Sequence, residues 1–164
     1  MKIFLDTADT DAIEKAYTTG IIDGVTTNPT LIRKSGRDPE EVYQQLIDYG
    51  INDISMEVVG DYNTMFEEGV RLSRKFGKAC TIKVPCTPDG LRVCRELSRD
   101  LVNVNVTLIF SAAQAILAAK SGAKYVSPFV GRVDDNSFVG MDLIEQISDI
   151  YTIQNVHKTE ILSA

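Results

Sequence analysis

Lys83 lies within the apolar run CTIKVP, which covers residues 80–85. Such a run is typical of a buried strand, where an isolated ammonium group is costly unless it is paired or neutral. Because burial lowers the pKa of a lysine, a buried lysine can act as a nucleophile that forms a Schiff base with a carbonyl substrate. The alternative is a lysine at a strand end whose ammonium group reaches water. The run therefore makes Lys83 a candidate for covalent catalysis.

Other polar residues of functional type recur in or directly after the remaining apolar runs. They are Asp6, Asn28, Glu57, Asn105, Thr107, Ser127 and Arg132. A single buried polar residue is usually a satisfied structural group. No solvated face explains a set that recurs on strand after strand, so we expect these side chains to serve one site.

The apolar segments predict seven strands, at residues 3–7, 24–28, 54–59, 81–85, 105–110, 125–130 and 160–164. Most of these runs are continuous, which suits parallel strands buried on both faces. Helices are expected between them, with starts at Asp38-Pro39, at Thr87-Pro88 and at Ser111, and with a further helix over residues 141–153. This alternation predicts an α/β fold with a parallel sheet.

Two architectures fit the alternation, an open doubly wound sheet and a (β/α)8 TIM barrel. No GxGxxG follows the first strand, and the chain has no GxxxxGK[ST] loop. In a doubly wound sheet the polar residues would gather at one switch point, whereas in a barrel they converge from every strand. The pattern favours a TIM barrel, formed by a single domain over residues 1–164.

The composition excludes several classes of function. The net charge of −6 and the absence of a basic block argue against nucleic-acid binding. No stretch approaches the length of a membrane helix, and the N-terminus begins with a strand pattern, so we expect a cytoplasmic protein. The three cysteines form no CxxC pair, which argues against a disulfide framework or a zinc site. The single histidine, His157, is expected in a surface loop.

Five segments together resemble the transaldolases, specifically the short branch that also includes fructose-6-phosphate aldolase. They are FLDTA at residues 4–8, GVTTNPT at 24–30, IKVP at 82–85, NVTLIFS at 105–111 and SPFVGR at 127–132. The resemblance covers essentially the whole chain and implies a TIM barrel of class I aldolase type. The TTNP and SPFVGR segments argue against another Schiff-base barrel, the deoxyribose-phosphate aldolase type.

The resemblance implies a mechanism without metal or organic cofactor. Lys83 would form a Schiff base with a ketose phosphate, and the iminium would accept the electrons of the breaking carbon–carbon bond. An aldose phosphate would leave, and a three-carbon dihydroxyacetone unit would stay on the enzyme until an acceptor aldehyde takes it. The partners implied are sugar phosphates: sedoheptulose 7-phosphate or fructose 6-phosphate as donor, and glyceraldehyde 3-phosphate or erythrose 4-phosphate as acceptor.

The family's roles carry over residue by residue. Asp6 matches the residue that transfers the proton of the reacting hydroxyl, although a carboxylate there could instead cap a helix, a task for which Asp9 and Thr10 are better placed. Glu57 and Thr107 match the pair that positions water, and Glu57 could also pair with Lys83. The remaining matches are substrate-binding positions: Asn28, Asn105 and Ser127 for hydrogen bonds to the sugar, Phe129 in the pocket wall, and Arg132 for phosphate.

Two positions distinguish the branches of the family. The aldolase type resembles this chain but has glutamine at the position of Glu57 and tyrosine at the position of Phe129. This chain therefore fits a transaldolase better than an aldolase.

The chain also departs from the family, because its seventh predicted strand reaches the last residue, Ala164. We expect the eighth strand and the last helices to be missing, with part of the phosphate site and the helix that joins subunits. A homo-oligomer is expected if those segments are supplied. The alternatives to a transaldolase are a fructose-6-phosphate aldolase and a non-catalytic truncated barrel with a binding or assembly role.

Overall fold

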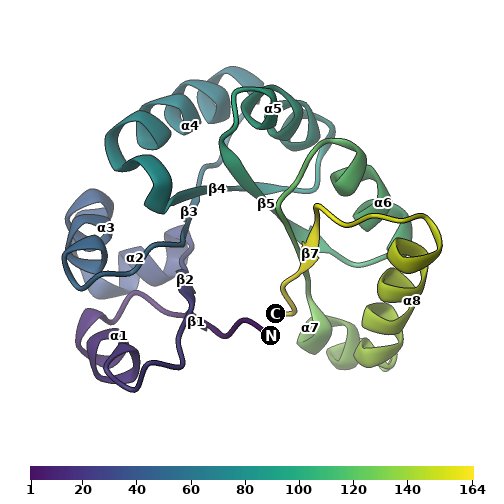
Figure 1. Cartoon of the computed structure of the whole chain (residues 1–164), viewed down its shortest axis with the longest axis horizontal. Helices are drawn as coiled ribbons and strands as arrows, with labels where there is room; N and C mark the ends of the chain where they lie inside the picture. The colour runs from purple at the N-terminus through teal and green to yellow at the C-terminus, as the bar shows by residue number, and fades with distance from the viewer. The chain divides into compact units, whose positions relative to one another are not determined.

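Seven parallel strands follow one another in chain order, β1-β2-β3-β4-β5-β6-β7, with helices between them. The computed structural model describes all 164 residues (Figure 1). Parallel strands that pair in chain order and are joined by helices are typical of a (β/α)8 barrel. This sheet has seven strands, so the eighth strand of such a barrel is absent from it. The predicted α/β fold, with its last strand missing, is confirmed.

The chain divides into two compact units. The first unit contains residues 1–57 and 70–82, and the second contains residues 58–69 and 83–164. The boundary passes through strand β4 (Cys80–Pro85) and helix α4 (Tyr62–Phe76).

The first unit is built on three strands, β1 (Phe4–Asp6), β2 (Gly24–Thr26) and β3 (Ile54–Glu57). Its helices are α1 (Thr10–Tyr17), α2 (Pro29–Ser35) and α3 (Pro39–Asp48), followed after α4 by the short 3-10 helix η1 (Gly77–Ala79). Asp9 caps α1 and Asp38 caps α3, as their side chains accept hydrogen bonds from backbone N–H groups of the first turn. The predicted cap at Asp38 is confirmed, and of the two candidates Asp9 and Thr10 the cap of α1 is Asp9.

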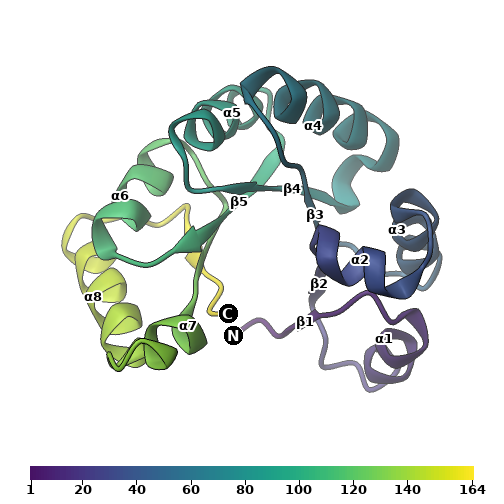
Figure 2. The same ribbon diagram turned by 180° about the vertical axis from the view of Figure 1, so that it is seen from behind.

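The second unit contains the strands β5 (Asn103–Ile109), β6 (Tyr125–Pro128) and β7 (Glu160–Ile161). Its helices are α5 (Pro88–Arg99), α6 (Ala112–Lys120), α7 (Val130–Asp135) and α8 (Gly140–Ile153). Figures 1 and 2 show α5, α6 and α8 on the same side of β5, β6 and β7. Backbone hydrogen bonds to the β6 segment continue beyond β7, and the Ala164 N–H donates to the Pro128 carbonyl at 2.9 Å.

Several strands end earlier than predicted. The strand predicted over residues 54–59 ends at Glu57, and the strand predicted over residues 160–164 ends at Ile161. Two other strands end early because helices begin there. The strand predicted over residues 24–28 ends at Thr26, since Asn28 caps α2 and Pro29 takes its first position. The strand predicted over residues 125–130 ends at Pro128, since Val130 begins α7. None of the helices has the length and apolar character that a membrane span requires.

Helix α5 starts so close to the end of β4 that a glycine is required. A Cβ added at Gly90 would lie 2.0 Å from the carbonyl oxygen of Pro85, which is a backbone atom of the strand that carries Lys83. Thr87, which caps the helix, also donates its backbone N–H to that carbonyl at 2.8 Å. The end of β4 and the first turn of α5 are therefore fixed to each other.

The replacement Gly90→Ala tests this close approach. Alanine normally stabilises a helix relative to glycine by about 1 kcal/mol. Here we expect the opposite sign, a loss of about 1–3 kcal/mol, because the strand end must move to admit the methyl group. Urea unfolding measures the difference. Gly131→Ala in α7 is the matched control, since a Cβ there meets nothing within 4 Å. A Gly90→Ala protein as stable as the control would contradict the account.

Candidate active site

Four polar side chains of the second unit are buried on the adjacent strands β4, β5 and β6. The exposed fractions are 6% for Lys83, 0% for Asn105, 1% for Thr107 and 2% for Ser127. Asn105 and Thr107 are two residues apart on β5, so their side chains leave the strand on the same face. The prediction that Lys83 is buried within a strand is confirmed.

Ser127 and Asn105 form a hydrogen bond across two strands. The Ser127 hydroxyl donates to Oδ1 of Asn105 at 2.9 Å, and both groups are buried. This bond fixes the orientation of the Asn105 amide, so that its Nδ2 group points away from Ser127. The proton of Ser127 is used inside the protein, and its oxygen can offer a ligand only an acceptor.

The hydroxyl of Thr107 is in the opposite situation. Its Oγ1 is buried and has no hydrogen-bond partner in the protein. A buried polar atom without a partner is uncommon, and an explanation is expected in the form of function or a bound water. Thr107 is one of the residues that the sequence singled out, and its unpartnered hydroxyl is available to a ligand.

Phe129 and Arg132 follow the end of β6. The half-buried Phe129 ring packs against Phe110, with ring centroids 5.6 Å apart at an angle of 64°. Arg132 lies in α7, where its side chain is 71% exposed and one guanidinium nitrogen is 3.6 Å from a carboxylate oxygen of Asp135. Its charge is accessible to a solvent-borne anion.

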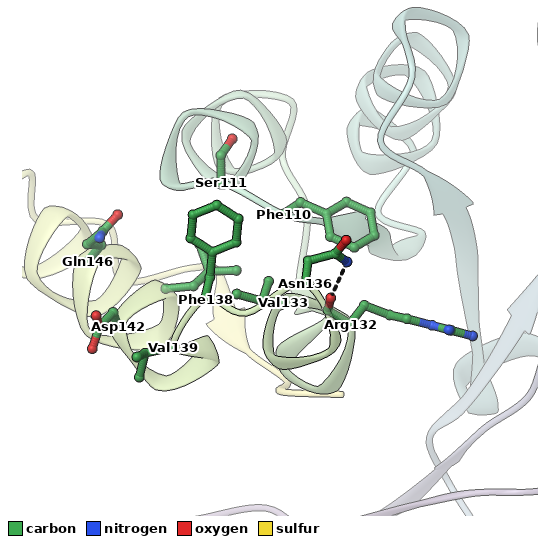
Figure 3. Close-up of a pocket in the computed structure, with 10 residues that line it drawn as sticks. Phe110, Ser111, Arg132, Val133, Asn136, Phe138, Val139, Asp142 and Gln146 are labelled. Atoms are coloured by element: carbon green, nitrogen blue, oxygen red, sulfur yellow. Dashed lines mark hydrogen bonds between the residues drawn. The ribbon is translucent and has the colours of Figure 1, made fainter.

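A cavity of about 450 Å³ lies between the end of β5, the start of α6, and helices α7 and α8. Figure 3 shows Phe110 and Phe138 on this cavity and the hydrogen bond from Asn136 to the backbone carbonyl of Arg132. Of the predicted site residues, only Arg132 borders it. The cavity is therefore distinct from the four buried polar side chains of β4, β5 and β6, which we call the buried polar row: Lys83, Asn105, Thr107 and Ser127.

The first unit contains the other three predicted residues, Asp6, Asn28 and Glu57. The exposed Asp6 ends β1 and accepts a hydrogen bond from the Thr26 hydroxyl at 2.9 Å. Glu57 ends β3 and is half-buried. Asn28 caps α2, with Oδ1 accepting from the Leu31 N–H at 3.0 Å. The carbonyl oxygen of the Asn28 side chain is therefore used by the fold, and its Nδ2 group is what the residue can offer to a ligand.

Thr26 is a functional candidate that the sequence analysis did not single out. It pairs directly with Asp6 in the register of β1 and β2, and its hydroxyl fixes one carboxylate oxygen. The register of two parallel strands would have revealed it, but the sequence alone does not give that register.

A model of the family described as Transaldolase/Fructose-6-phosphate aldolase matches residues 3–164. The chain belongs to this family. Its relatives include a protein from Nitrosopumilus maritimus named "Probable transaldolase", which is 50% identical over all of this chain and 74% of its own length. Proteins of the same name from Sphingopyxis alaskensis and Clostridium botulinum strain Hall are 54% and 48% identical. They cover 92% and 100% of this chain, and the chain covers 70% and 75% of their lengths.

The cysteines of this transaldolase/fructose-6-phosphate aldolase family member are all free thiols. Burial raises the pKa of Cys80 and of Cys94 to about 12, with a further contribution from the charge of Asp53 at Cys80. Burial also raises the pKa of Cys86, which is half-buried. The expectation of unpaired thiols is confirmed. His157 is exposed, also as predicted.

Two substitutions on the buried polar row should change stability in opposite directions. Thr107→Val replaces an unpartnered hydroxyl by a methyl group of the same shape, so we expect a gain of about 1 kcal/mol. Ser127→Ala removes the buried hydrogen bond from the Ser127 hydroxyl to Oδ1 of Asn105, so we expect a loss of about 1 kcal/mol. Chemical denaturation of both variants beside the wild type measures the two signs. Destabilisation by Thr107→Val would show that its hydroxyl has a structural partner.

Proposed function

We propose that this chain catalyses transfer of a dihydroxyacetone unit from a ketose phosphate to an aldose phosphate through a Schiff base on Lys83. The donor would be sedoheptulose 7-phosphate or fructose 6-phosphate, and the acceptor glyceraldehyde 3-phosphate or erythrose 4-phosphate. The observation that supports the proposal best is a 6% exposed lysine on an interior strand of a transaldolase/fructose-6-phosphate aldolase family member. The relatives' names point to the same activity.

The proposed chemistry begins with attack of Lys83 Nζ on the ketose carbonyl. Loss of water from the carbinolamine leaves a protonated iminium, which accepts the electron pair of the breaking carbon–carbon bond. Asp6 takes the proton of the hydroxyl next to that bond, and the aldose phosphate leaves. The resulting enamine adds to the acceptor aldehyde, Asp6 returns the proton, and water releases the product from Lys83.

The other residues bind and orient in this proposal. Glu57 and Thr107 hold the water that forms and hydrolyses the iminium, a role that the unpartnered Thr107 hydroxyl supports. The Nδ2 groups of Asn28 and Asn105 donate to substrate hydroxyls, as their side-chain oxygens accept hydrogen bonds from the protein. Arg132 binds the phosphate with an exposed guanidinium group.

Transfer rather than simple cleavage is proposed because Glu57 and Phe129 stand where the aldolase branch has glutamine and tyrosine. The test compares fructose 6-phosphate alone with fructose 6-phosphate plus erythrose 4-phosphate. We expect sedoheptulose 7-phosphate only when the acceptor is present, and little free dihydroxyacetone without it. Rapid release of dihydroxyacetone in the absence of an acceptor would instead identify a fructose-6-phosphate aldolase.

Asn28 offers a test that separates its structural role from its proposed binding role. Asn28→Asp keeps an oxygen that caps α2 but removes the Nδ2 donor, whereas Asn28→Ala removes both. We expect the aspartate variant to unfold like the wild type and to lose at least about tenfold in kcat/KM, since one lost hydrogen bond to substrate corresponds to roughly 1–2 kcal/mol. The alanine variant should lose stability as well. Wild-type kcat/KM in Asn28→Asp would limit Asn28 to capping.

A further inference from the structure

Leu108 has a left-handed backbone conformation close to the end of strand β5. Its φ is +60°, and it lies in β5 directly after Thr107. The other non-glycine residues with positive φ, Leu101, Ser137 and Asn155, lie outside strands and helices. A leucine with this φ is strained, and such strain persists only where the surrounding structure imposes it.

The strain coincides with one extra residue in β5. Val106 pairs with Val126 and Ile109 pairs with Pro128, so three steps along β5 match two steps along β6. This is a β-bulge, in which Thr107 and Leu108 together stand opposite Ser127.

The bulge changes the face of the sheet on which the side chains that follow it lie. In a regular strand Ile109 would share the face of Asn105 and Thr107, because alternate residues share a face. With the extra residue, Ile109 shares the face of Val106 instead, where it is fully buried. Leu108 takes up the additional position and is 39% exposed.

The bulge also explains why Thr107 and Ser127 are not bonded to each other. Regular pairing would place these residues opposite one another on neighbouring parallel strands, about 4.8 Å apart. Instead, Ser127 donates to Asn105, and the Thr107 hydroxyl has no partner. The bulge thus removes this pairing, so that the Ser127 hydroxyl bonds to Asn105 and the Thr107 hydroxyl stays available.

Backbone hydrogen bonds on both sides hold the bulge in place. The Thr107 carbonyl accepts from the Cys86 N–H at 2.9 Å, next to the end of the Lys83 strand. The Ile109 carbonyl accepts from the Phe129 N–H at 3.0 Å. The strained residue therefore lies between anchors to both neighbouring strands.

We propose that Leu108 is a positioning residue, whose left-handed bulge keeps the Thr107 hydroxyl out of the Ser127–Asn105 hydrogen bond and available to the water of the iminium steps. The inference rests on the proposed function. The bulge acts through Thr107, and the Leu108 side chain takes no part in the chemistry itself.

The experiment compares residues that tolerate a left-handed backbone with one that resists it. Leu108→Gly and Leu108→Asn accept positive φ and should keep the bulge, with kcat close to that of the wild type. Leu108→Val disfavours positive φ, because valine is β-branched. We expect kcat of the transfer from fructose 6-phosphate to erythrose 4-phosphate to fall by about tenfold or more. KM for fructose 6-phosphate should change little.

A second comparison shows whether the effect passes through Thr107. In the Thr107→Val background, Leu108→Val should cost little further kcat, because the hydroxyl that the bulge positions is already absent. An equal cost in both backgrounds would overturn the proposal. So would wild-type kcat in a folded Leu108→Val protein, or a tenfold loss in the folded glycine and asparagine variants. If Leu108→Val does not fold, Leu108→Gly and Leu108→Asn still test the proposal. A wild-type protein without transfer activity would overturn the proposed function and this inference with it.

Discussion

A polar side chain buried on an interior strand must find a partner in the protein or be used by a ligand, and the organisation of β4, β5 and β6 follows from this constraint. Ser127 and Asn105 satisfy one another. Thr107 has no protein partner for its hydroxyl. Lys83 is buried on the neighbouring strand. An apolar row at these positions would make a more stable core, so stability alone does not account for the polar row.

The ends of the strands are held by the helices that follow them. Asn28 caps α2, Thr87 caps α5 and Ser111 caps α6, each within three residues of the preceding strand's end. Gly90 lets the first turn of α5 contact the Pro85 carbonyl. Such short connections leave the strand ends little freedom, and a Schiff-base lysine requires neighbours that keep their positions through several steps.

Much of this organisation was predictable from the sequence. Continuous apolar runs gave the seven strands, and the caps at Asp38, Thr87 and Ser111 gave three helix starts to the residue. The position of Lys83 followed from its apolar neighbours. Family motifs then supplied the candidate roles, since spacing alone cannot say what a polar residue on a strand does.

Other features depend on tertiary pairing and were not predictable. Strands β2 and β6 end before their predicted limits because Asn28 caps α2 and Val130 begins α7. The bulge at Leu108 has no signal in the sequence, because leucine rarely adopts positive φ and only the register with β6 imposes it. The sequence likewise does not show that the Ser127 hydroxyl donates to Asn105, or that the side-chain oxygen of Asn28 accepts from the backbone of α2.

The central claim is that Lys83 forms the covalent intermediate, and borohydride reduction tests it most directly. The protein is incubated with fructose 6-phosphate, reduced with sodium borohydride, digested and mapped by mass spectrometry. The account predicts a reduced three-carbon unit on Lys83, and no such adduct in a Lys83→Arg protein treated in the same way. An adduct on a different lysine, or no adduct on folded wild-type protein, would contradict it.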